Sequence, residues 1–400
     1  MVRLLWRRKQ VDKTEFLSDV LSTFRLAIIV LFSFGGICDK FHAWEKTYGG
    51  PGDEEGHSII ALNDYSYYIV AGKTNSFGSG GFDVYLIKID DDGDLLWERT
   101  YGGERDDWGE SVCEAQDGGY LIAGCTASYG AGGYDVYLIK VAEDGGLEWT
   151  KTYGGSGDDF GHEVIVTRDG GYLVVGSTRS YGAGGEDVYL LKLDGNGDTV
   201  WVRVLGGAGD DCGYSVVQVS DGSYVVVGST TSEGSGGKDV YLVKISEHGN
   251  FIWSRTYGGV EDDEGYDVRC AAVAGFILTG YTQSFGSGGA DVYVVKADSI
   301  GKREWEGYYG GEGDDCGIVI LERAREEYLV AGWSSNGDCD MYLLRLKSDE
   351  DPGVADIGYE GLEKCFVALL TSYGNMITVG MTNSVGEGGK DVYVVESYYW

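Results

Sequence analysis

The chain has 400 residues, of which 43% are apolar and 13% aromatic, with 68 glycines and only 2 prolines. This composition excludes an acidic disordered polymer and a Pro-rich chain, and the glycines lack the every-third-residue period of collagen. Acidic residues outnumber basic ones by 65 to 31, which gives a formal net charge of −34. Such a charge repels nucleic acid and anionic membranes, and it favours cations, basic partners or a saline medium.

The N-terminal segment predicts export from the cytoplasm. Basic residues are frequent in residues 1–25, an apolar run follows at residues 26–37, and polar Asp39 and Lys40 end it. The run is too short to span a bilayer, which needs about 20 residues, although an uncleaved anchor reaching back to Val20 stays open. We therefore expect an export signal or N-terminal membrane anchor at residues 1–40, and one extracytoplasmic domain at residues 41–400 whose membrane contact is through this segment.

A repeat of about 52 residues fills the rest of the chain. Asp-Val-Tyr, once varied to Asp-Met-Tyr, occurs seven times at spacings of 49 to 52 residues, beginning at Asp83, Asp135, Asp187, Asp239, Asp291, Asp340 and Asp391. A tryptophan followed by an aromatic-Gly-Gly step recurs with the same period from Trp44 to Trp305, with Leu205 as the exception to the aromatic residue. No second globular domain fits in what remains.

Each unit predicts four short strands. Between Gly161 and Gly206, three turn signals separate four apolar segments: Asp169-Gly-Gly, the Gly-rich loop at residues 180–186, and Asp194-Gly-Asn-Gly. Helical periodicity is absent. Seven four-stranded units, none of which can bury both faces alone, describe an all-β fold, a seven-bladed β-propeller of antiparallel blades.

The two ends of the repeat series predict how the ring closes. Asp391 begins a third strand with no room for a fourth, whereas Trp44 lies in a lone fourth strand ahead of the first complete unit. Pairing them completes the seventh blade and leaves no exposed edge. The sixth unit lacks three residues of its Gly-rich loop, and residues 352–359 replace its tryptophan strand, so we expect the least regular blade there.

The repeat resembles a known family. The strings beginning at Tyr153 (YGGSGDDFG), Asp169 (DGGYLVVGST) and Asp187 (DVYLLKLD) are similar to the β-propeller repeat of secreted bacterial and archaeal proteins, the SBBP repeat. The likeness covers residues 44–400. It implies a secreted propeller and carries over no catalytic residue. The hairpin from Asp90 to Trp97 also resembles the tryptophan-docking repeats of quinoprotein dehydrogenases, although its Asp-to-Gly step is one residue shorter.

Repeated carboxylates are the first candidate site. The crossovers between units and the Gly-rich loops emerge on the same face of a propeller. Five crossovers carry an aspartate pair: Asp106-Asp107, Asp158-Asp159, Asp210-Asp211, Asp262-Asp263 and Asp314-Asp315. Among glycine carbonyls such carboxylates are suited to calcium, the one cofactor that the pattern indicates. The other interpretation, which we favour, is that each aspartate accepts backbone N–H groups and fixes its own turn.

Positions that differ between units give further candidates. His57, Glu110 and His162 follow the crossover glycine in three consecutive units, where they would form a transition-metal site if they lie close enough. Aromatic residues gather in the same units, and we expect Phe82, Trp108, Tyr134 and Phe160 to bind a ligand. A second aromatic column, Phe77, Tyr129, Tyr181 and Phe285, recurs in enough units to suggest packing within its own loop.

The eight cysteines do not recur at one repeat position, and Cys316 with Cys339 is the disulfide candidate, against two free thiols. No nucleophile elbow, zinc-binding helix or nucleotide loop is present. We therefore expect a monomeric, non-catalytic, extracytoplasmic binding propeller for a glycan or a basic protein surface. The alternative is a secreted enzyme, either a metal-dependent hydrolase or lyase or a quinoprotein-like dehydrogenase, with its site at the channel mouth.

Overall fold

Alternating turn signals and short apolar segments form strands throughout the repeat. The computed structural model describes residues 42–62, 65–335, 339–347, 353–357 and 363–397. The chain divides between Phe41 and His42, so the predicted export signal or anchor at residues 1–40 lies outside the described residues. Among the residues that are described, none belongs to a helix with the length and apolar character needed to cross a membrane.

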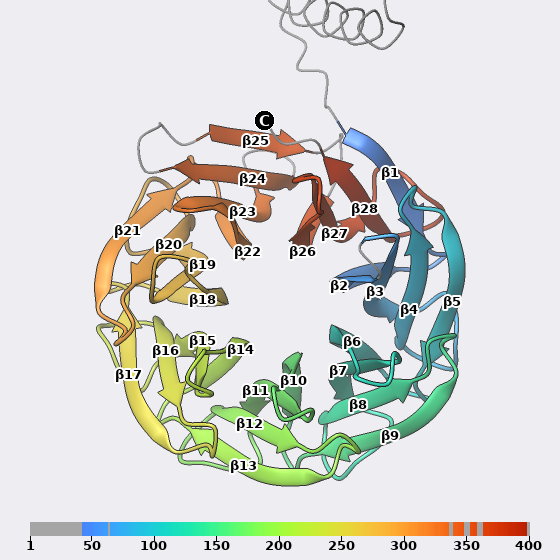
Figure 1. The fold of residues 1–400 in the computed structure, drawn as a ribbon, viewed down its shortest axis with the longest axis horizontal. Coiled ribbons are helices and arrows are strands. Elements are labelled where there is room, and N and C mark those ends of the chain that lie inside the picture. Colours follow the sequence, from blue (N-terminus) through green and yellow to red (C-terminus); the bar gives the residue numbers. More distant parts are fainter. Residues whose placement is uncertain (1–41, 63–64, 336–338, 348–352, 358–362, 398–400) are drawn as a thin grey trace, which may run out of the picture. The chain divides into compact units, whose positions relative to one another are not determined.

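The strands of residues 42–397 form seven four-stranded antiparallel sheets arranged around a central channel (Figure 1). Blade one contains β2 (Glu54–Leu62), β3 (Tyr67–Thr74), β4 (Asp83–Asp90) and β5 (Leu95–Tyr101). Blade two contains β6 (Asp107–Glu114), β7 (Tyr120–Thr126), β8 (Asp135–Val141) and β9 (Leu147–Tyr153). Blade three contains β10 (Asp159–Val166), β11 (Tyr172–Thr178), β12 (Asp187–Leu193) and β13 (Thr199–Leu205).

The remaining blades follow the same order from the channel outward. Blade four contains β14 (Asp211–Gln218), β15 (Tyr224–Thr230), β16 (Asp239–Ile245) and β17 (Phe251–Tyr257). Blade five contains β18 (Asp263–Cys270), β19 (Phe276–Thr282), β20 (Asp291–Ala297) and β21 (Arg303–Tyr309). Blade six contains β22 (Asp315–Ala324), β23 (Glu327–Ser334), β24 (Asp340–Lys347) and β25 (Gly353–Ile357). Blade seven contains β26 (Glu363–Leu370), β27 (Met376–Thr382), β28 (Asp391–Ser397) and β1 (His42–Tyr48).

The structure confirms the predicted seven-bladed fold and its closure. β1 pairs antiparallel with β28, from His42 opposite Ser397 to Tyr48 opposite Val392. The outermost strand of blade six, β25, has 5 residues, whereas the outermost strands of the other blades have 7, as expected for the least regular unit.

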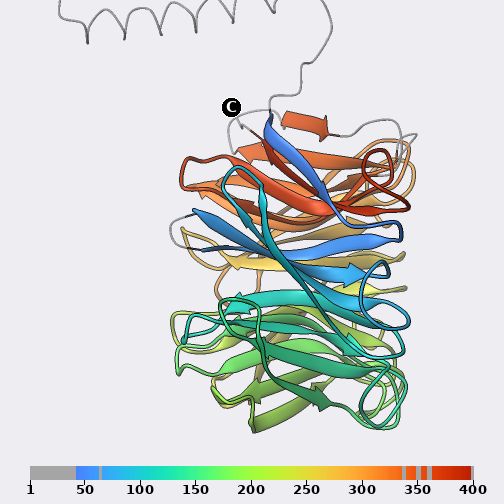
Figure 2. The ribbon, with the colours of Figure 1, turned by 90° about the vertical axis from the view of Figure 1, so that its right-hand side faces the viewer.

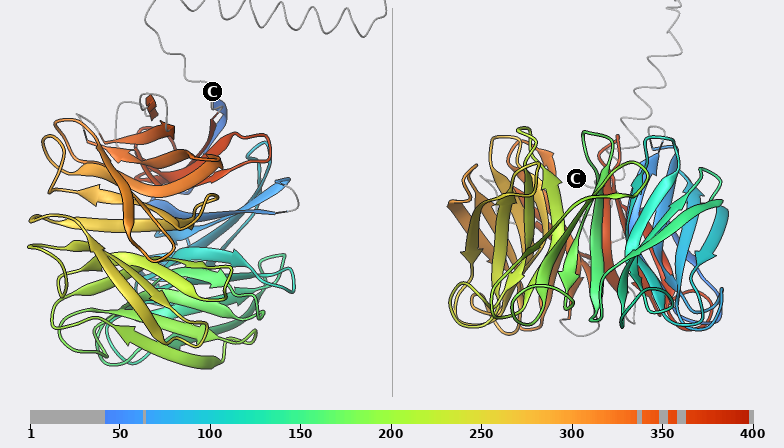
Figure 3. Two further views of the ribbon diagram at one scale, coloured as in Figure 1. Left: turned by 60° about the vertical axis from the view of Figure 1, so that its left-hand side comes forward. Right: turned by 90° about the horizontal axis from the view of Figure 1, so that it is seen from below.

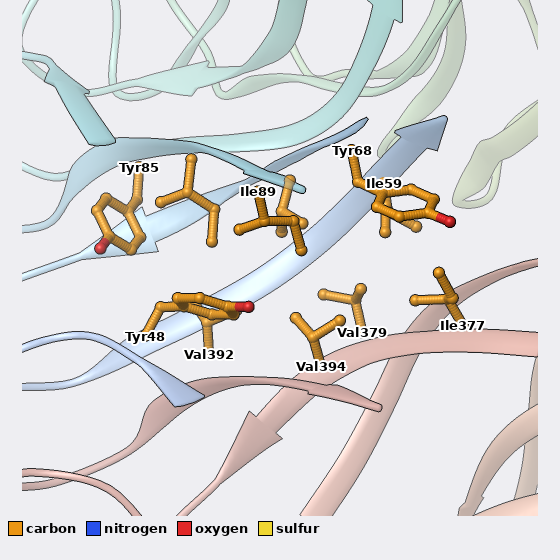
Figure 4. Close-up of a cluster of buried hydrophobic side chains, with 11 residues drawn as sticks. Tyr48, Ile59, Tyr68, Tyr85, Ile89, Ile377, Val379, Val392 and Val394 are labelled. Atoms are coloured by element: carbon orange, nitrogen blue, oxygen red, sulfur yellow. The ribbon is translucent and has the colours of Figure 1, made fainter. Parts of the chain in front are cut away.

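The hydrophobic core lies between the blades. The buried apolar side chains form seven clusters, and each contains residues from two neighbouring blades. Figure 4 shows the cluster where the ring closes, in which Tyr48, Val392 and Val394 of blade seven face Ile59 and Tyr85 of blade one. Because no blade has a core of its own, blades stabilise one another and the closing strand matters to the whole ring.

The outer wall repeats one docking contact. Trp149 of blade two packs on the hairpin residue Gly197 of blade three, where a Cβ atom would lie 2.7 Å from the indole. Gly197 has φ +77°, a conformation that glycine adopts at little cost. The Tyr153 hydroxyl donates to the Gly197 carbonyl. Where Leu205 replaces this tyrosine in blade three, the Arg203 Nε donates to the Gly249 carbonyl instead, at 2.9 Å.

Loops emerge on two opposite faces of the ring (Figures 2 and 3). The crossovers between blades lie beside the Gly-rich loops, since the Phe82 N–H donates to the Asp106 carboxylate of the next blade at 2.9 Å. The structure therefore agrees with the sidedness that the strand order predicts, and it places both candidate sites on one face.

Candidate ligand-binding site at the channel mouth

A β-bulge near the start of each innermost strand directs side chains toward the channel. In β6 the register shifts between Gly109 and Ser111, and the same shift occurs in all seven blades. A bulge leaves one residue unpaired and re-aims its side chain. The bulged residues, in blade order, are His57, Glu110, His162, Tyr214, Tyr266, Ile318 and Phe366, and all line a cavity of about 470 Å³.

Two more positions per blade lie on the same face as the bulged residues, and their chemistry also changes from blade to blade. The first follows the crossover carboxylates: Glu55, Trp108, Phe160, Cys212, Glu264, Cys316 and Lys364. The second precedes the third strand: Phe82, Tyr134, Glu186, Lys238, Ala290, Cys339 and Lys390. Together with the bulged residues we call them the mouth positions.

Aromatic side chains at the mouth positions form a continuous arc. Ring centroids are 5.0 Å apart between Trp108 and Tyr134, and 5.6 Å apart between Tyr134 and Phe160. The series continues through the mouth positions His162, Tyr214 and Tyr266 and ends at Tyr281 of β19, at centroid separations of 6.2, 5.3, 5.2 and 6.0 Å. Every ring of this aromatic arc is partly exposed. These spacings are those of interacting aromatic pairs, so the arc is a pre-formed surface.

Of the four predicted ligand-binding residues, Trp108, Tyr134 and Phe160 thus lie in contact. Phe82 is linked to them by the Lys73 ammonium. The Lys73 ammonium is 5.1 Å from the Phe82 ring and 5.8 Å from the Trp108 ring. The shared aromatic column behaves differently. Tyr129 donates to the Gly102 carbonyl and packs on Tyr137 of its own blade, contacts that fit a packing role for that column.

Glu55 pairs with cations from blades one and seven. Its carboxylate lies 3.0 Å from the Lys73 Nζ, 3.1 Å from the Lys390 Nζ and 3.3 Å from the His57 Nε2. Burial favours the neutral acid, but the hydrogen bond from His57 and the charge of Lys73 outweigh it and hold the pKa of Glu55 well below its usual range. The Glu55 carboxylate is therefore fully paired, and the two lysines together exceed its charge by one.

Glu264 has the corresponding role in blade five. Its buried carboxylate accepts hydrogen bonds from the Lys238 ammonium at 2.6 Å, the Tyr214 hydroxyl at 3.0 Å and the Tyr281 hydroxyl at 3.1 Å. Two members of the aromatic arc are thereby held in place by a charged acceptor. Such charge-assisted bonds are stronger than neutral ones, so they fix the orientation of both rings.

The predicted metal residues His57, Glu110 and His162 meet at the cavity wall. His57 Nδ1 lies 3.2 Å from the Glu110 carboxylate and 3.0 Å from the Gly109 carbonyl. Burial opposes its charged form, but Glu110 and Glu55 raise the pKa of His57 to about 9. Both ring nitrogens of His57 thus have partners already, Nδ1 at Glu110 and Gly109 and Nε2 at Glu55. Burial lowers the pKa of His162, whose ring stacks on Phe160. Within the described part of the chain, no three His, Cys, Asp or Glu residues are grouped to hold a metal ion.

The crossover aspartates predicted to bind calcium are engaged with backbone. The first of each pair accepts a backbone N–H of the preceding blade, as Asp158 does from Tyr134 at 2.9 Å; the others are Asp106, Asp210, Asp262 and Asp314. The second is fully buried and accepts a glycine N–H of its own crossover, as Asp107 does from Gly103 at 2.7 Å; the others are Asp159, Asp211, Asp263 and Asp315. These contacts are those of the turn-fixing interpretation.

The cysteine pair is separate in the structure. Cys316 is buried in β22 opposite Trp333, Cys339 precedes β24, and both are free thiols. Burial raises the pKa of each thiol, which lowers its reactivity. The candidate disulfide is therefore not formed here.

The cavity wall below the mouth holds a group that the sequence analysis missed. Side chains one residue after the bulge accept an N–H of the next blade: Ser58 from Val112, Ser111 from Val164, Glu163 from Val216, Ser215 from Val268 and Asp267 from Ile320. Three units have serine at this position. Glu163 and Asp267 replace it in two others, and this departure from the repeat is the sequence signal that could have identified the group. Arg269 binds Asp267 at 3.2 Å and lines the same cavity.

Comparisons with known proteins support the fold more than any activity. No family model matches the chain. The regulatory protein FlaEY of Caulobacter vibrioides is 29% identical over 200 residues, which are 43% of this chain and 21% of that protein. This chain therefore spans about a fifth of that curated relative.

Solved structures with the same fold are distant in sequence. The structure of YCF48 bound to D1 peptide has a TM-score of 0.51 at 11% identity, over 89% of this chain and 96% of that one. Polysaccharide lyase Uly1 also has a TM-score of 0.51, at 8% identity, over 91% and 94% of the two chains. Likeness at such identities shows the β-propeller fold alone.

Proposed function

We propose that this protein is an extracytoplasmic, non-catalytic propeller that binds a neutral glycan at the channel mouth. The aromatic arc carries the proposal. Trp108, Tyr134 and Phe160 present neighbouring rings. They contact Lys73 and His162, which line a cavity of about 470 Å³. Pyranose rings stack on such faces through their C–H groups, and concave, aromatic-lined sites with a few fixed polar groups are typical of small-ligand recognition.

Charge pairing favours a glycan over a basic protein. Although the chain carries a net charge of −34, its mouth carboxylates are already neutralised by the mouth's own cations, Glu55 by Lys73 and Lys390, and Glu264 by Lys238. A basic partner would have to break these pairs before it gained any of its own. A neutral ligand with ring faces has no such cost, and hydroxyl groups of sugars suit the polar groups between the rings.

The comparisons are compatible with either ligand class. A propeller that holds a peptide and a propeller that is a polysaccharide lyase both share this fold. The basic and apolar order of residues 1–40 supports an extracytoplasmic location, where glycans occur.

Binding to neutral oligosaccharides, measured by calorimetry and by tryptophan fluorescence, tests the proposal. We expect Trp108→Ala and Tyr134→Ala each to weaken binding by at least about tenfold, because each removes a stacking face. Tyr373→Ala is the matched control, since Tyr373 is 89% exposed in the hairpin between β26 and β27, on the opposite face. Unchanged affinity in both mouth variants would refute the site, and binding of lysine-rich peptides in place of sugars would support the basic-protein alternative.

A second candidate function is acid–base catalysis on a bound glycan. Burial, together with the charge of Asp267, raises the pKa of Glu163 to about 7, although Arg269 opposes this. A carboxyl group that exchanges protons near neutral pH beside an ion-paired carboxylate is an arrangement that glycan-cleaving enzymes use. We expect Glu163→Gln to abolish cleavage and to keep binding. If the wild-type protein releases no product from an oligosaccharide that it binds, this candidate is wrong.

A further inference from the structure

A groove of about 540 Å³ on the outer wall has a charge opposite to that of the chain. It lies between β17 of blade four and the hairpin that precedes β21 of blade five. Three cations line it, Arg255, Lys302 and Arg303, and all three are exposed. We call it the outer-wall basic groove.

The groove lies where a hairpin position that is aspartate in two other blades is lysine. At the two equivalent interfaces that carry a hairpin aspartate, this residue neutralises a strand lysine: Asp94 pairs with Lys46 at 3.0 Å, and Asp198 pairs with Lys151 at 2.6 Å. Lys302 occupies the same hairpin position facing Arg255. Arg303 follows where blade three has Thr199. One ion pair is thus replaced by three like charges.

Fixed contacts hold the arginines in the groove. The Arg255 guanidinium lies 5.3 Å from the Trp253 ring and donates to the Ser254 carbonyl at 2.6 Å. Arg303 is held at 2.5 Å by Glu306, which also accepts the Tyr293 hydroxyl. Like charges gathered this way repel one another, and an anion relieves that repulsion.

Glu306 pairs with Arg303, whereas Asp239 and Asp298 are turned to backbone donors. Asp239, which lines it, is 2% exposed and accepts the Ser235 N–H at 2.7 Å, and burial raises its pKa. Asp298 accepts the N–H groups of Ile300 and Lys302 at 3.0 and 2.8 Å. Neither carboxylate forms a direct ion pair with the three cations.

We propose that the outer-wall basic groove binds a tetrahedral oxyanion, the phosphate or sulfate group of a ligand. Guanidinium groups present paired N–H donors that match such oxyanions, and a lysine adds a point charge. The distant negative charges of the chain oppose this little, because salt screens exposed charges beyond about 8 Å. The proposal is independent of glycan binding at the mouth.

The test uses inorganic phosphate as the probe, followed by calorimetry at physiological ionic strength, where the distant charges are screened. We expect saturable binding with a roughly millimolar Kd and a stoichiometry of one. The variant Lys302→Asp/Arg303→Thr introduces the residue types of blade three, which fold there as Asp198 and Thr199, and should weaken binding at least about tenfold. The reverse variant, Asp198→Lys/Thr199→Arg, should add a second binding site beside Lys151.

Two further probes identify the source of the oxyanion. A sugar phosphate or a sulfated disaccharide that binds more tightly than inorganic phosphate indicates a sugar-borne group, whereas equal affinity indicates the free ion. Trp108→Ala should leave phosphate binding unchanged, which separates this groove from the mouth. Absence of saturable binding in the wild-type protein, or equal affinity in the Lys302→Asp/Arg303→Thr variant, overturns the proposal.

Discussion

The outer wall and the channel mouth are built from the same repeat but use it in opposite ways. On the wall, a tryptophan packs on a hairpin glycine at one interface after another, as Trp44 does on Gly93 and Trp253 does on Gly301. At the mouth, neighbouring blades present Glu55, Trp108 and Phe160 at one position. Stability is thus divided among many equivalent contacts, whereas the proposed recognition depends on a few side chains that occur once.

The largest loss of stability is expected from removing β1, the strand that closes the ring. Deleting residues 41–50 removes β1, the Tyr48 side chain in the core between blades seven and one, and its bond to the Gly93 carbonyl at 2.6 Å. We expect a loss of more than about 5 kcal/mol in unfolding free energy, because truncating one buried aromatic residue already costs about 3–5 kcal/mol. Thermal denaturation followed by circular dichroism measures it, with a chain lacking only residues 1–40 as the control. Equal melting of the two chains would show that β1 does not close the ring.

A pair of glycine substitutions measures a single wall contact. Gly197 and Gly118 both have positive φ, +77° and +86°, so alanine is strained at either position. An added Cβ would meet Trp149 at 2.7 Å in the first case and nothing within 4 Å in the second. We expect Gly118→Ala to cost about 1–2 kcal/mol and Gly197→Ala about 1–3 kcal/mol more. Urea denaturation compares them, and equal costs would mean that the tryptophan contact contributes little.

The sequence predicted the wall better than the mouth for a physical reason. A motif repeated in every unit indicates a shared backbone conformation, so the strands and turns could be inferred from the Asp-Val-Tyr repeat. The ring closure could be inferred from the lone strand that contains Trp44. The aromatic candidates Trp108, Tyr134 and Phe160 were found because they break that pattern. Their contact, and the neutralisation of Glu55 by Lys390, join residues far apart in the sequence. Local spacing carries no information on such pairs.

Low pH should stabilise the fold through aspartates at the start of the third strand of a blade. Burial raises the pKa of Asp83 and of Asp391 to about 6, with further rises from Asp107 and Glu54, and burial also raises the pKa of Asp187. Folding therefore favours their protonated forms, and this stabilisation is present at low pH and lost as the pH rises through about 6. His57, with its pKa raised to about 9, loses its contribution as the pH rises further, so both effects act in the same direction.

We accordingly expect the Tm to fall by roughly 5 °C between pH 5 and pH 8, measured at constant ionic strength. Asp83→Asn should reduce this slope, because it removes one of the titrating groups and keeps the shape of the side chain. A Tm that rises over the same range would show that these carboxyl groups are ionised in the folded protein.

The smallest effect is expected from calcium. The crossover aspartates accept hydrogen bonds from backbone N–H groups, as Asp106 does from Phe82 and Asp107 does from Gly103. The buried Oδ1 atoms of Asp211, Asp263 and Asp315 have no hydrogen-bond partner among the described residues. One such oxygen per crossover is far from the six to eight that calcium requires. We expect a change in Tm of less than about 1 °C between excess calcium and excess chelator, in thermal scans at fixed ionic strength. Calcium at a hundred times its Kd would add about 2.7 kcal/mol, so a rise of several degrees that chelator reverses would establish these aspartates as ligands.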